Sequence, residues 1–151
     1  MLDRELNLLK PVIIVEDEPL IQIRLKQILF QLGYMAEDLY FAQNIAIANT
    51  LVNKHPVAFA LVDLGLPDGN GIEFIQRLKQ HNADIPILVI SAWSFDEMIL
   101  DALQSGATGY LLKERDDIEI LLSIRNIFRG GAPIDPFIAH KILHLIAAKK
   151  T

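Results

Sequence analysis

Polar side chains that could carry out chemistry follow four short apolar segments of the sequence. Three acidic residues follow the first segment, and an aspartate, a serine and a lysine follow the others in that order. These residues are Glu16, Asp17, Glu18, Asp63, Ser91 and Lys113. Taken singly, each has an ordinary explanation as a solvated turn residue or a strand-end lysine that reaches water. Because chance rarely supplies all four positions in this order, we treat them as one constellation.

This set of residues could support the transfer of a phosphoryl group with the help of a metal ion. Crowded carboxylates repel one another, so the site either raises the pKa of one acid or binds a hard divalent cation. Mg²⁺ is the natural candidate, because it accepts one or two protein carboxylates and leaves positions for water and phosphate oxygens. A carboxylate beside the metal, an ammonium and a hydroxyl could together form an acyl phosphate. Asp63 is the best nucleophile because it stands alone after its apolar segment.

Apolar runs of strand length alternate with longer stretches of helical periodicity, which predicts an α/β fold with a parallel sheet. The strands are expected at residues 12–15, within 34–40, and at 57–62, 85–90 and 108–112. Helices are expected at residues 19–32, 45–52, 71–80, 94–104 and 116–128. The fourth helix would begin with a capping box between Ser94 and Glu97. Because parallel strands end along one edge, where ligands bind, the four polar positions should converge.

Local signals also mark where the first and last helices begin and end. Pro19 suits the first turn of a helix and Gly33 suits its end. The apolar face of this helix is expected to include Leu20, Ile23, Leu25, Ile28 and Leu29. An aspartate followed by a proline predicts one further helix over residues 136–148.

Composition favours a single acidic domain. The 151 residues, 52% of them hydrophobic, suffice for one well-buried core. A formal net charge of -5 does not favour direct binding of nucleic acid or an anionic membrane, because both require clustered lysine and arginine side chains. Cysteine is absent, which excludes disulfides and thiolate metal sites. Residues 1–10 lack the pattern of a signal peptide, and no apolar run approaches the ~20 residues that cross a bilayer as a helix. We therefore expect a cytoplasmic protein.

Four segments of the sequence together resemble the CheY-like receiver domains of two-component response regulators. They are VEDEP at residues 15–19, LVDLGLPDGNG at 61–71, ISA at 90–92 and GATGYLLK at 106–113. The resemblance covers about residues 11–128, and the combined motifs are highly specific although each alone is weak. It implies a doubly wound (βα)5, flavodoxin-like parallel sheet, to which the C-terminal helix is an addition.

The resemblance also suggests how the chain is divided. Residues 1–10 would be a lead, residues 11–129 the receiver domain, and residues 130–151 a linker with the C-terminal helix. Glu114 in place of a proline, and Gly130 before the last helix, look most like the regulators of the LuxR/NarL type. In those regulators a DNA-binding helix-turn-helix domain normally follows. We expect no such domain within this chain.

The roles that receivers give to the matching residues concern phosphorylation and metal binding. Asp63 would be the phosphorylated aspartate, and Glu16 and Asp17 would be the acidic pair that binds Mg²⁺ together with it. Gly65 would complete the protein ligands of the metal with its backbone carbonyl. Lys113 would pair with the phosphoryl group. Glu16 departs from the family, in which this position is more often an aspartate with a shorter side chain.

A second group of matching residues would respond to phosphorylation. Ser91 would be the switch hydroxyl that moves toward the phosphoryl group, and Tyr110 would be the switch aromatic that turns inward into the vacated space. Trp93 lies two residues after Ser91, at a rim position where its bulk could hinder the water that hydrolyses the acyl phosphate. A partly exposed aromatic of no consequence is the plain alternative for Trp93.

The resemblance further implies the partners of the chain. A sensor histidine kinase, or a small phosphodonor, would supply the phosphoryl group, and a second copy of the chain could bind to the switching face. The output would be a downstream effector protein or a DNA-binding domain that regulates transcription. Lys141, Lys149 and Lys150 are too few and too linear to read DNA directly. The chain would be a switch that assists its own phosphorylation and dephosphorylation, and not an enzyme with a separate substrate.

Two alternative functions share part of this pattern. A phosphatase of the haloacid-dehalogenase type also uses an aspartyl nucleophile and Mg²⁺, but it would carry a second acid where this chain has Gly65. A degenerate receiver that only mediates contacts would be expected to lack Asp63 or Lys113, and both are present. Nucleotide binding through a phosphate-binding loop is disfavoured, because the sequence has no Gly-x-x-x-x-Gly-Lys motif.

Overall fold

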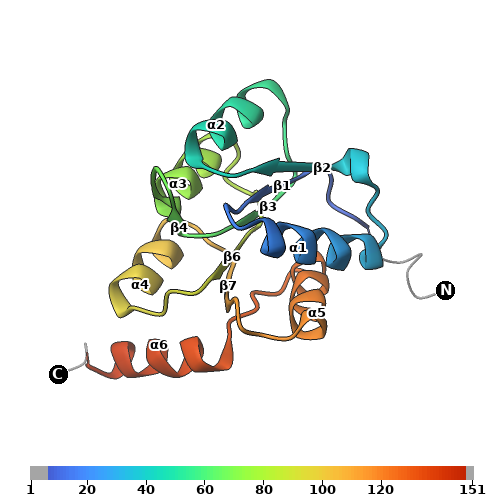
Figure 1. Ribbon diagram of the computed structural model, residues 1–151. Coiled ribbons are helices and arrows are strands. Elements are labelled where there is room, and N and C mark those ends of the chain that lie inside the picture. The colour runs from blue at the N-terminus through green and yellow to red at the C-terminus, as the bar shows by residue number, and fades with distance from the viewer. Residues whose placement is uncertain (1–6, 149–151) are drawn as a thin grey trace.

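A five-stranded parallel sheet forms the centre of the computed structural model, which describes residues 7–148 (Figure 1). The strands stand in the order β2-β1-β3-β6-β7, with bounds Leu39–Ala42, Val12–Val15, Phe59–Val62, Ile87–Ser91 and Gly109–Leu112. The chain starts in the middle of the sheet, moves to one edge and then crosses to the other, so the sheet is doubly wound. The predicted fold class is confirmed. Residues 1–6 of the expected lead, and Lys149 and Lys150, lie outside the described residues.

Helices cover both faces of the sheet (Figure 1). One face carries α1 and α5, with bounds Pro19–Leu32 and Asp117–Phe128. The other carries α2, α3 and α4, with bounds Ile45–Lys54, Gly71–His81 and Asp96–Gln104. The predicted C-terminal helix is present as α6, Pro136–Ala148, and packs beside α4. Within the described residues, we find no helix of sufficient length and apolar character to span a bilayer.

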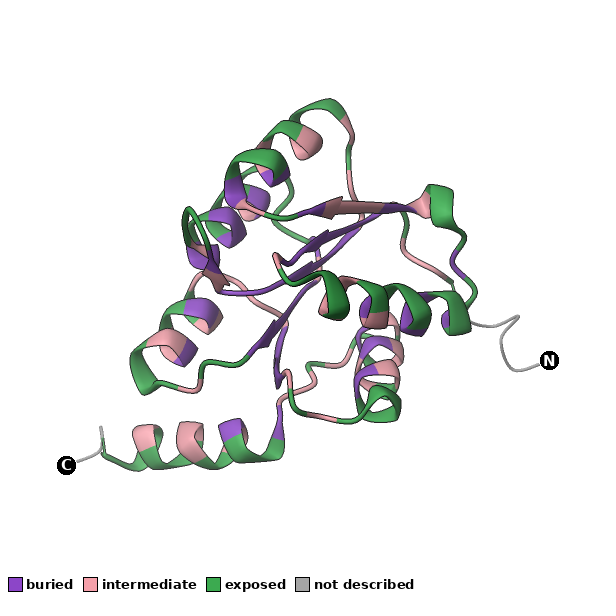
Figure 2. Cartoon of the chain, viewed as in Figure 1, coloured by how far each residue is buried: buried purple, intermediate pink, exposed green. Residues whose placement is uncertain are grey.

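Strands β1, β3, β6 and β7 are buried on both faces, which explains their apolar sequences, whereas the edge strand β2 is partly exposed (Figure 2). In β1, Ile13 and Val15 point toward α2, α3 and α4, whereas Val12 and Ile14 point toward α1 and α5. All four side chains are at most 1% exposed. A parallel sheet between two helical layers therefore needs no polar residue until each strand ends, and that is where the polar residues stand.

The segment after β3 folds back as a small hairpin that the sequence did not predict. Its two short strands are β4, Gly65–Leu66, and β5, Gly69–Asn70. Gly69 has a φ of 152°, which side chains of L-residues rarely allow. A Cβ atom on Gly71 would lie 2.4 Å from the backbone oxygen of Asp63. Glycine at these positions lets the hairpin pass close beneath the strand end.

The start of the C-terminal segment, which we define as residues 133–148, pairs with the outer edge of β7. The Tyr110 amide donates to the Pro133 carbonyl at 3.0 Å, and the Asp135 amide donates to the Tyr110 carbonyl at 2.8 Å. The bridge between Tyr110 and Ile134 is parallel. A Cβ atom on Gly109 would lie 2.4 Å from the Pro133 carbonyl oxygen, so glycine permits this close approach.

The second strand lies later in the chain than residues 34–40. A 3-10 turn, η2, occupies Ala36–Asp38, and β2 begins only at Leu39. The Asp38 carboxylate accepts a hydrogen bond from the Met35 amide at 2.9 Å, which favours the turn. Tyr34 is buried, and its hydroxyl donates to the Leu9 carbonyl at 2.5 Å. Tyr34, which suggested that the strand begins at residue 34, therefore packs into the core before β2 starts.

Two predictions about helices were wrong in detail. Leu20 and Ile23 are 80% and 52% exposed, because α1 contacts the sheet through a narrower face than predicted. The other three predicted residues, Leu25, Ile28 and Leu29, are buried there together with Leu32. The capping box of α4 does not form: the helix begins at Asp96 after Phe95, without a side-chain cap. Ser94 instead offers its carbonyl to the Lys141 ammonium of α6 at 2.7 Å.

Replacement of Phe59 by alanine should lower the free energy of unfolding by about 3–5 kcal/mol, because it leaves a cavity in the packed core. Phe59 is fully buried, and its ring lies edge-on to Phe128 with centroids 5.4 Å apart. Phe95, which is 67% exposed, provides the matched control and should lose about 0.5 kcal/mol or less as Phe95→Ala. Urea denaturation measures both, and equal losses would contradict the assigned core.

Candidate functional site

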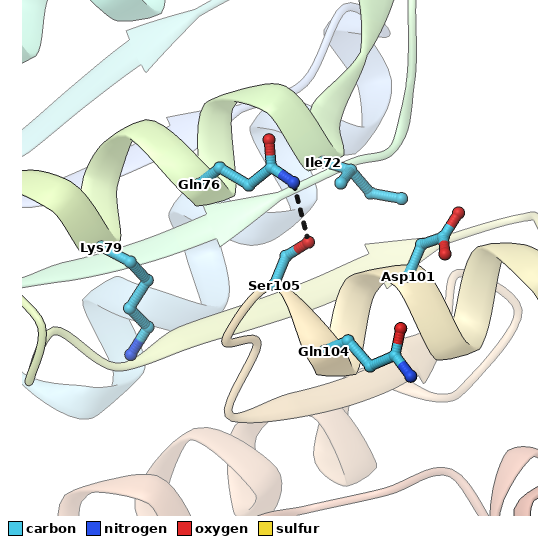
Figure 3. Close-up of a pocket in the computed structure, with 6 residues that line it drawn as sticks. All are labelled: Ile72, Gln76, Lys79, Asp101, Gln104 and Ser105. Carbon is cyan, nitrogen blue, oxygen red and sulfur yellow. Dashed lines mark hydrogen bonds between the residues drawn. The ribbon is translucent and has the colours of Figure 1, made fainter.

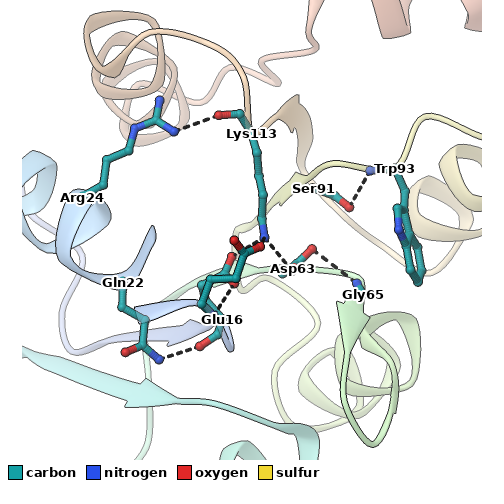
Figure 4. Close-up of polar contacts among 9 residues, drawn as sticks. Glu16, Gln22, Arg24, Asp63, Gly65, Ser91, Trp93 and Lys113 are labelled. Carbon is teal, nitrogen blue, oxygen red and sulfur yellow. Dashed lines mark hydrogen bonds and ion pairs between the residues drawn. The ribbon is translucent and has the colours of Figure 1, made fainter. Parts of the chain in front are cut away.

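The carboxyl ends of four strands bring the predicted polar residues together (Figure 4). Val15 is paired with Val62, so Glu16 and Asp63 both follow the same level of the sheet. Further along the sheet, Ser91 of β6 is paired with Leu112 of β7, the residue before Lys113. The sheet register alone therefore places these side chains along one edge.

The ammonium group of Lys113 is the centre of the site. Its Nζ atom lies 2.8 Å from Glu16 Oε1, 2.8 Å from Glu18 Oε1 and 2.9 Å from Asp63 Oδ2. Burial alone would lower the pKa of the ammonium, but the hydrogen bonds to Glu16, Glu18 and Asp63 raise it above its ordinary value. Lys113 is therefore a permanent cation that is shared among three carboxylates.

Glu16 is the most deeply buried acid of the site, with 2% of its surface exposed. Its Oε2 atom accepts a hydrogen bond from the Glu18 amide at 2.9 Å. Burial raises the pKa of Glu16 to about 7, although its hydrogen bonds to Lys113 and Glu18 act in the opposite direction. Near neutral pH, the site thus holds an acid that a second cation would help to ionise.

The acidic cluster, which we define as Glu16, Asp17 and Glu18, fits a hard divalent cation. Their carboxylate oxygens lie within 4.8 Å of one another. Asp17 is partly buried and Glu18 is exposed, so the cluster opens to solvent. An oxygen-only donor set with one side open to water suits Mg²⁺, which retains several of its waters when it binds.

Asp63 lies across from this cluster and is 5% exposed. Its Oδ2 atom pairs with Lys113, and its Oδ1 atom accepts a hydrogen bond from the Gly65 amide at 3.3 Å. A Cβ atom on Gly65 would lie only 2.8 Å from the ring of Trp93. The indole therefore lies against the hairpin two residues from Asp63, in the place where a side chain at position 65 would stand.

Ser91, Trp93 and Tyr110 form a connected group next to Asp63. The Ser91 hydroxyl accepts a hydrogen bond from the Trp93 amide at 3.1 Å, and the Tyr110 hydroxyl donates to the Trp93 carbonyl at 2.6 Å. Burial raises the pKa of Tyr110 to about 12, so it is a neutral donor. The Tyr110 ring is fully buried, so it lies inward in this structure, and its movement on phosphorylation stays a prediction. The C-terminal segment pairs with the backbone of Tyr110.

Side chains of α1 also reach the site, and the sequence analysis missed them. Gln22 donates from its Nε2 atom to the Glu16 carbonyl at 2.5 Å, and Arg24 donates from Nη1 to the Lys113 carbonyl at 2.8 Å. Arg24 also bonds to the Arg115 carbonyl and the Asp117 carboxylate. Nothing in their local sequence separates these two residues from the ordinary polar face of a helix.

A separate hollow lies between α3 and α4 (Figure 3). Its lining comprises Ile72, Gln76, Lys79, Asp101, Gln104 and Ser105. Gln76 and Ser105 are joined by a hydrogen bond of 3.4 Å across it. None of the residues that line this hollow belongs to the constellation at the strand ends. We therefore assign the candidate phosphoryl chemistry to the strand ends and not to the hollow.

A doubly wound sheet, whose carboxyl edge holds an acidic cluster and a partly buried lysine beside an aspartate, is the α/β arrangement that the resemblance to receiver domains predicts. The family model "Response regulator receiver domain" matches residues 12–125. The chain therefore belongs to the response regulator receiver family, as the sequence motifs predicted. The roles of the individual site residues remain predictions.

Known proteins support the same assignment. The chain is 31% identical to the transcriptional regulatory protein DegU of Brevibacillus brevis, over 87% of this chain and 56% of DegU. A LuxR-family response regulator from Aurantimonas sp. SI85-9A1 superposes with a TM-score of 0.78 at 22% identity, over 93% of this chain and 99% of that one. A Burkholderia pseudomallei response regulator, solved with a phosphorylated aspartic acid and a calcium ion, gives 0.68 at 25% identity, over 80% and 69%. The chain spans about half the length of DegU.

The raised pKa of Glu16 makes stability depend on pH in metal-free protein. Between the ordinary glutamate pKa of 4.5 and the folded-state pKa of about 7, the folded state binds more protons than the unfolded state. The contribution of the Glu16 carboxyl to stability is therefore fully present below pH 4.5 and is lost as the pH rises through about 7. Relative to Glu16→Gln, the parent should lose about 2–3 kcal/mol across this window.

Urea denaturation in a chelator-containing buffer at several pH values measures this difference. Glu73, an exposed residue of α3, gives the matched control as Glu73→Gln, which should follow the parent. If the parent and Glu16→Gln change in parallel with pH, the carboxyl of Glu16 does not carry the predicted raised pKa.

Proposed function

We propose that this chain accepts a phosphoryl group on Asp63 and thereby switches the surface that it offers to partners. The observation that carries the proposal is the contact of 2.9 Å between the Lys113 ammonium and the Asp63 carboxylate, at an edge that also holds the acidic cluster. A nucleophilic carboxylate, a fixed cation and a metal-binding acidic cluster are the parts that phosphoryl transfer needs.

The groups at the carboxyl edge of the sheet account for each step of phosphoryl transfer. A carboxylate oxygen of Asp63 attacks phosphorus of a phosphohistidine, the bond between nitrogen and phosphorus breaks, and its electron pair remains on the imidazole. Lys113 and the Ser91 hydroxyl stabilise the charge on the phosphoryl oxygens. Glu16, Asp17, Asp63 and the Gly65 carbonyl would hold Mg²⁺, which supplies further neutralisation of that charge.

The phosphodonor in this proposal is a sensor histidine kinase or a small acyl phosphate, and the place of action is the cytoplasm. Hydrolysis reverses the switch: water attacks phosphorus, the bond between Asp63 and phosphorus breaks, and inorganic phosphate leaves. This self-dephosphorylation makes the chain a timed switch and not an enzyme with turnover of a separate substrate. The output would pass to an effector protein, a second copy of the chain or a DNA-binding domain.

The two alternatives explain the site less well. A haloacid-dehalogenase-type phosphatase needs a second acid two residues after its nucleophile, and Gly65 stands there against the ring of Trp93. A degenerate receiver would not require the contact between Asp63 and Lys113. Removing two charged groups from water is costly even when they are paired, so a chain that did not use this pair would gain little by keeping it. Both observations favour phosphorylation on Asp63.

Phosphorylation in this proposal stabilises an arrangement that is already populated. Because Tyr110 is inward and bonded to the Trp93 carbonyl, a phosphoryl group that bonds to Ser91 would favour the state seen here over its alternatives. Amide exchange in α4, β7 and α5 should then become slower on phosphorylation. Exchange in these elements that is the same with and without a phosphoryl mimic would contradict the switch.

Incubation with Mg²⁺ and acetyl phosphate should add one hydroxylamine-labile phosphoryl group to the parent and none to Asp63→Asn. The amide that replaces the carboxylate cannot act as the nucleophile. Intact mass before and after hydroxylamine treatment measures the result. Asp84→Asn, a change at an exposed aspartate, is the control and should behave as the parent does. Equal labelling of Asp63→Asn and the parent would refute the assignment.

Loss of the Trp93 ring should shorten the lifetime of the phosphorylated state. The indole lies against Gly65, which has no side chain to screen Asp63, and 37% of Trp93 is exposed. A tenfold change in the rate of hydrolysis corresponds to only about 1.4 kcal/mol of activation free energy, which the exclusion of one attacking water can supply. Trp93→Ala should therefore lose phosphate about tenfold faster, whereas Trp93→Phe, which retains a ring, should stay near the parent. A hydrolysis rate that Trp93→Ala leaves unchanged would return Trp93 to an ordinary surface aromatic.

A further inference from the structure

The loop that carries Lys113 is held from two sides by parts of the chain that are distant in sequence. We define this β7–α5 loop as residues 113–116. From one side, Arg24 of α1 bonds to the carbonyls of Lys113 and Arg115. From the other side, Asp135 of the C-terminal segment bonds to the side chain of Arg115. Both contacts act on residues within two positions of Lys113.

Asp135 connects three elements with one carboxylate. Its Oδ1 atom accepts hydrogen bonds from Nη2 of Arg115 at 2.8 Å and from the Phe137 amide of α6 at 2.9 Å. Its Oδ2 atom accepts from Nε of Arg115 at 2.5 Å and from the Leu112 amide of β7 at 3.5 Å. Asp135 is fully buried, so these bonds replace its hydration. Leu112 directly precedes Lys113, and Arg115 follows it by two residues.

The charge of Asp135 is retained despite this burial. Burial acts to raise the pKa of the carboxyl, but the Arg115 guanidinium and the amides of Phe137 and Leu112 together hold it below its usual value. A buried carboxylate that is ionised and paired on several sides has little freedom to move. It is therefore a firm link between the C-terminal segment and the strand end.

The rest of the C-terminal segment is docked on the same side of the molecule. Ile138 is fully buried in the cluster that contains Tyr110. Lys141 donates to the Ser94 carbonyl, next to Trp93, and lies 3.4 Å from the Asp96 carboxylate. The segment thus contacts both loops that border Asp63: the one with Trp93 and the one with Lys113.

We propose that Asp135 is a positioning residue for Lys113, and that docking of the C-terminal segment is coupled through it to capture of the phosphoryl group. Asp135 does not itself contact Asp63, and it acts by holding the Leu112 amide before Lys113 and the Arg115 side chain after it. The inference rests on the proposed function, because the coupling has a purpose only if Lys113 pairs with a phosphoryl group. Linkage is reciprocal, so occupation of the site must also strengthen docking of α6.

Binding of beryllofluoride, a phosphoryl mimic, in the presence of Mg²⁺ tests the coupling. Trp93 is the single tryptophan of the chain and borders the site, so its fluorescence reports binding. Asp135→Ala should weaken beryllofluoride binding about fivefold or more. Asp135→Asn, which retains an oxygen for the two backbone amides, should recover part of the affinity. The double variant with Arg115→Ala and Asp135→Ala should bind beryllofluoride no more weakly than Asp135→Ala alone, because both substitutions remove the same link.

Asn44→Ala is the matched control for a merely structural effect. Asn44 caps α2 by accepting the Ile47 amide at 2.8 Å, as Asp135 caps α6, and it follows β2, the edge strand opposite β7. This variant should lose stability and keep the parent affinity for beryllofluoride. In the parent, beryllofluoride should also slow amide exchange in residues 136–148, and in Asp135→Ala it should not.

The outcomes separate the two claims. If the parent binds beryllofluoride and Asp135→Ala binds it within twofold as well, the positioning role is overturned and the proposed function stands. Equal weakening by Asn44→Ala and Asp135→Ala also overturns it, since both then act through stability. If the parent does not bind the mimic with Mg²⁺ present, the proposed function fails and the inference fails with it.

Discussion

The structure depends on one charge balance: a single partly buried ammonium, Lys113, is shared by the carboxylates of Glu16, Glu18 and Asp63. Three acids and one base leave the edge short of positive charge, and burial makes that shortage costly. Burial, with a smaller contribution from the charge of Asp63, raises the pKa of Glu16. An edge of this kind gains by binding a divalent cation, and with that cation it can accept the further negative charge of a phosphoryl group.

The surroundings of the edge serve to hold this balance in place. The sheet register sets the level at which each polar residue emerges, and the hairpin after β3 relies on Gly71 to pass close beneath Asp63. Arg24 holds the Lys113 carbonyl from one side of the sheet, and Asp135 holds the neighbouring residues from the other. Because these contacts come from the two ends of the chain, the site has its final geometry only when the whole domain is folded.

The sequence predicted the fold and the centre of the site because both follow from local patterns. Buried parallel strands are continuously apolar, so the first polar residue after each one is conspicuous. The edge strand β2 has a mixed burial pattern and a preceding turn, which blurred its start. The Asp135-Pro136 pair predicted the start of the last helix, but the contacts of Arg24 and Asp135 with the loop of Lys113 gave no local signal, since those partners lie 89 and 20 residues away. The pairing of the C-terminal segment with β7 likewise gave no local signal, because it joins the backbone of Tyr110 to residues outside the βα series.

The most direct test of the account is chemical mapping of the acceptor in the unaltered chain. Borohydride converts an aspartyl phosphate to homoserine, which tandem mass spectrometry locates in the sequence. After incubation with Mg²⁺ and acetyl phosphate, the account predicts homoserine at position 63 and none at Asp17 or Asp68, with no conversion when Mg²⁺ is removed by a chelator. Conversion at another carboxylate, or equal conversion without Mg²⁺, would contradict the claim that Asp63, Lys113 and the acidic cluster form one metal-assisted phosphoacceptor site.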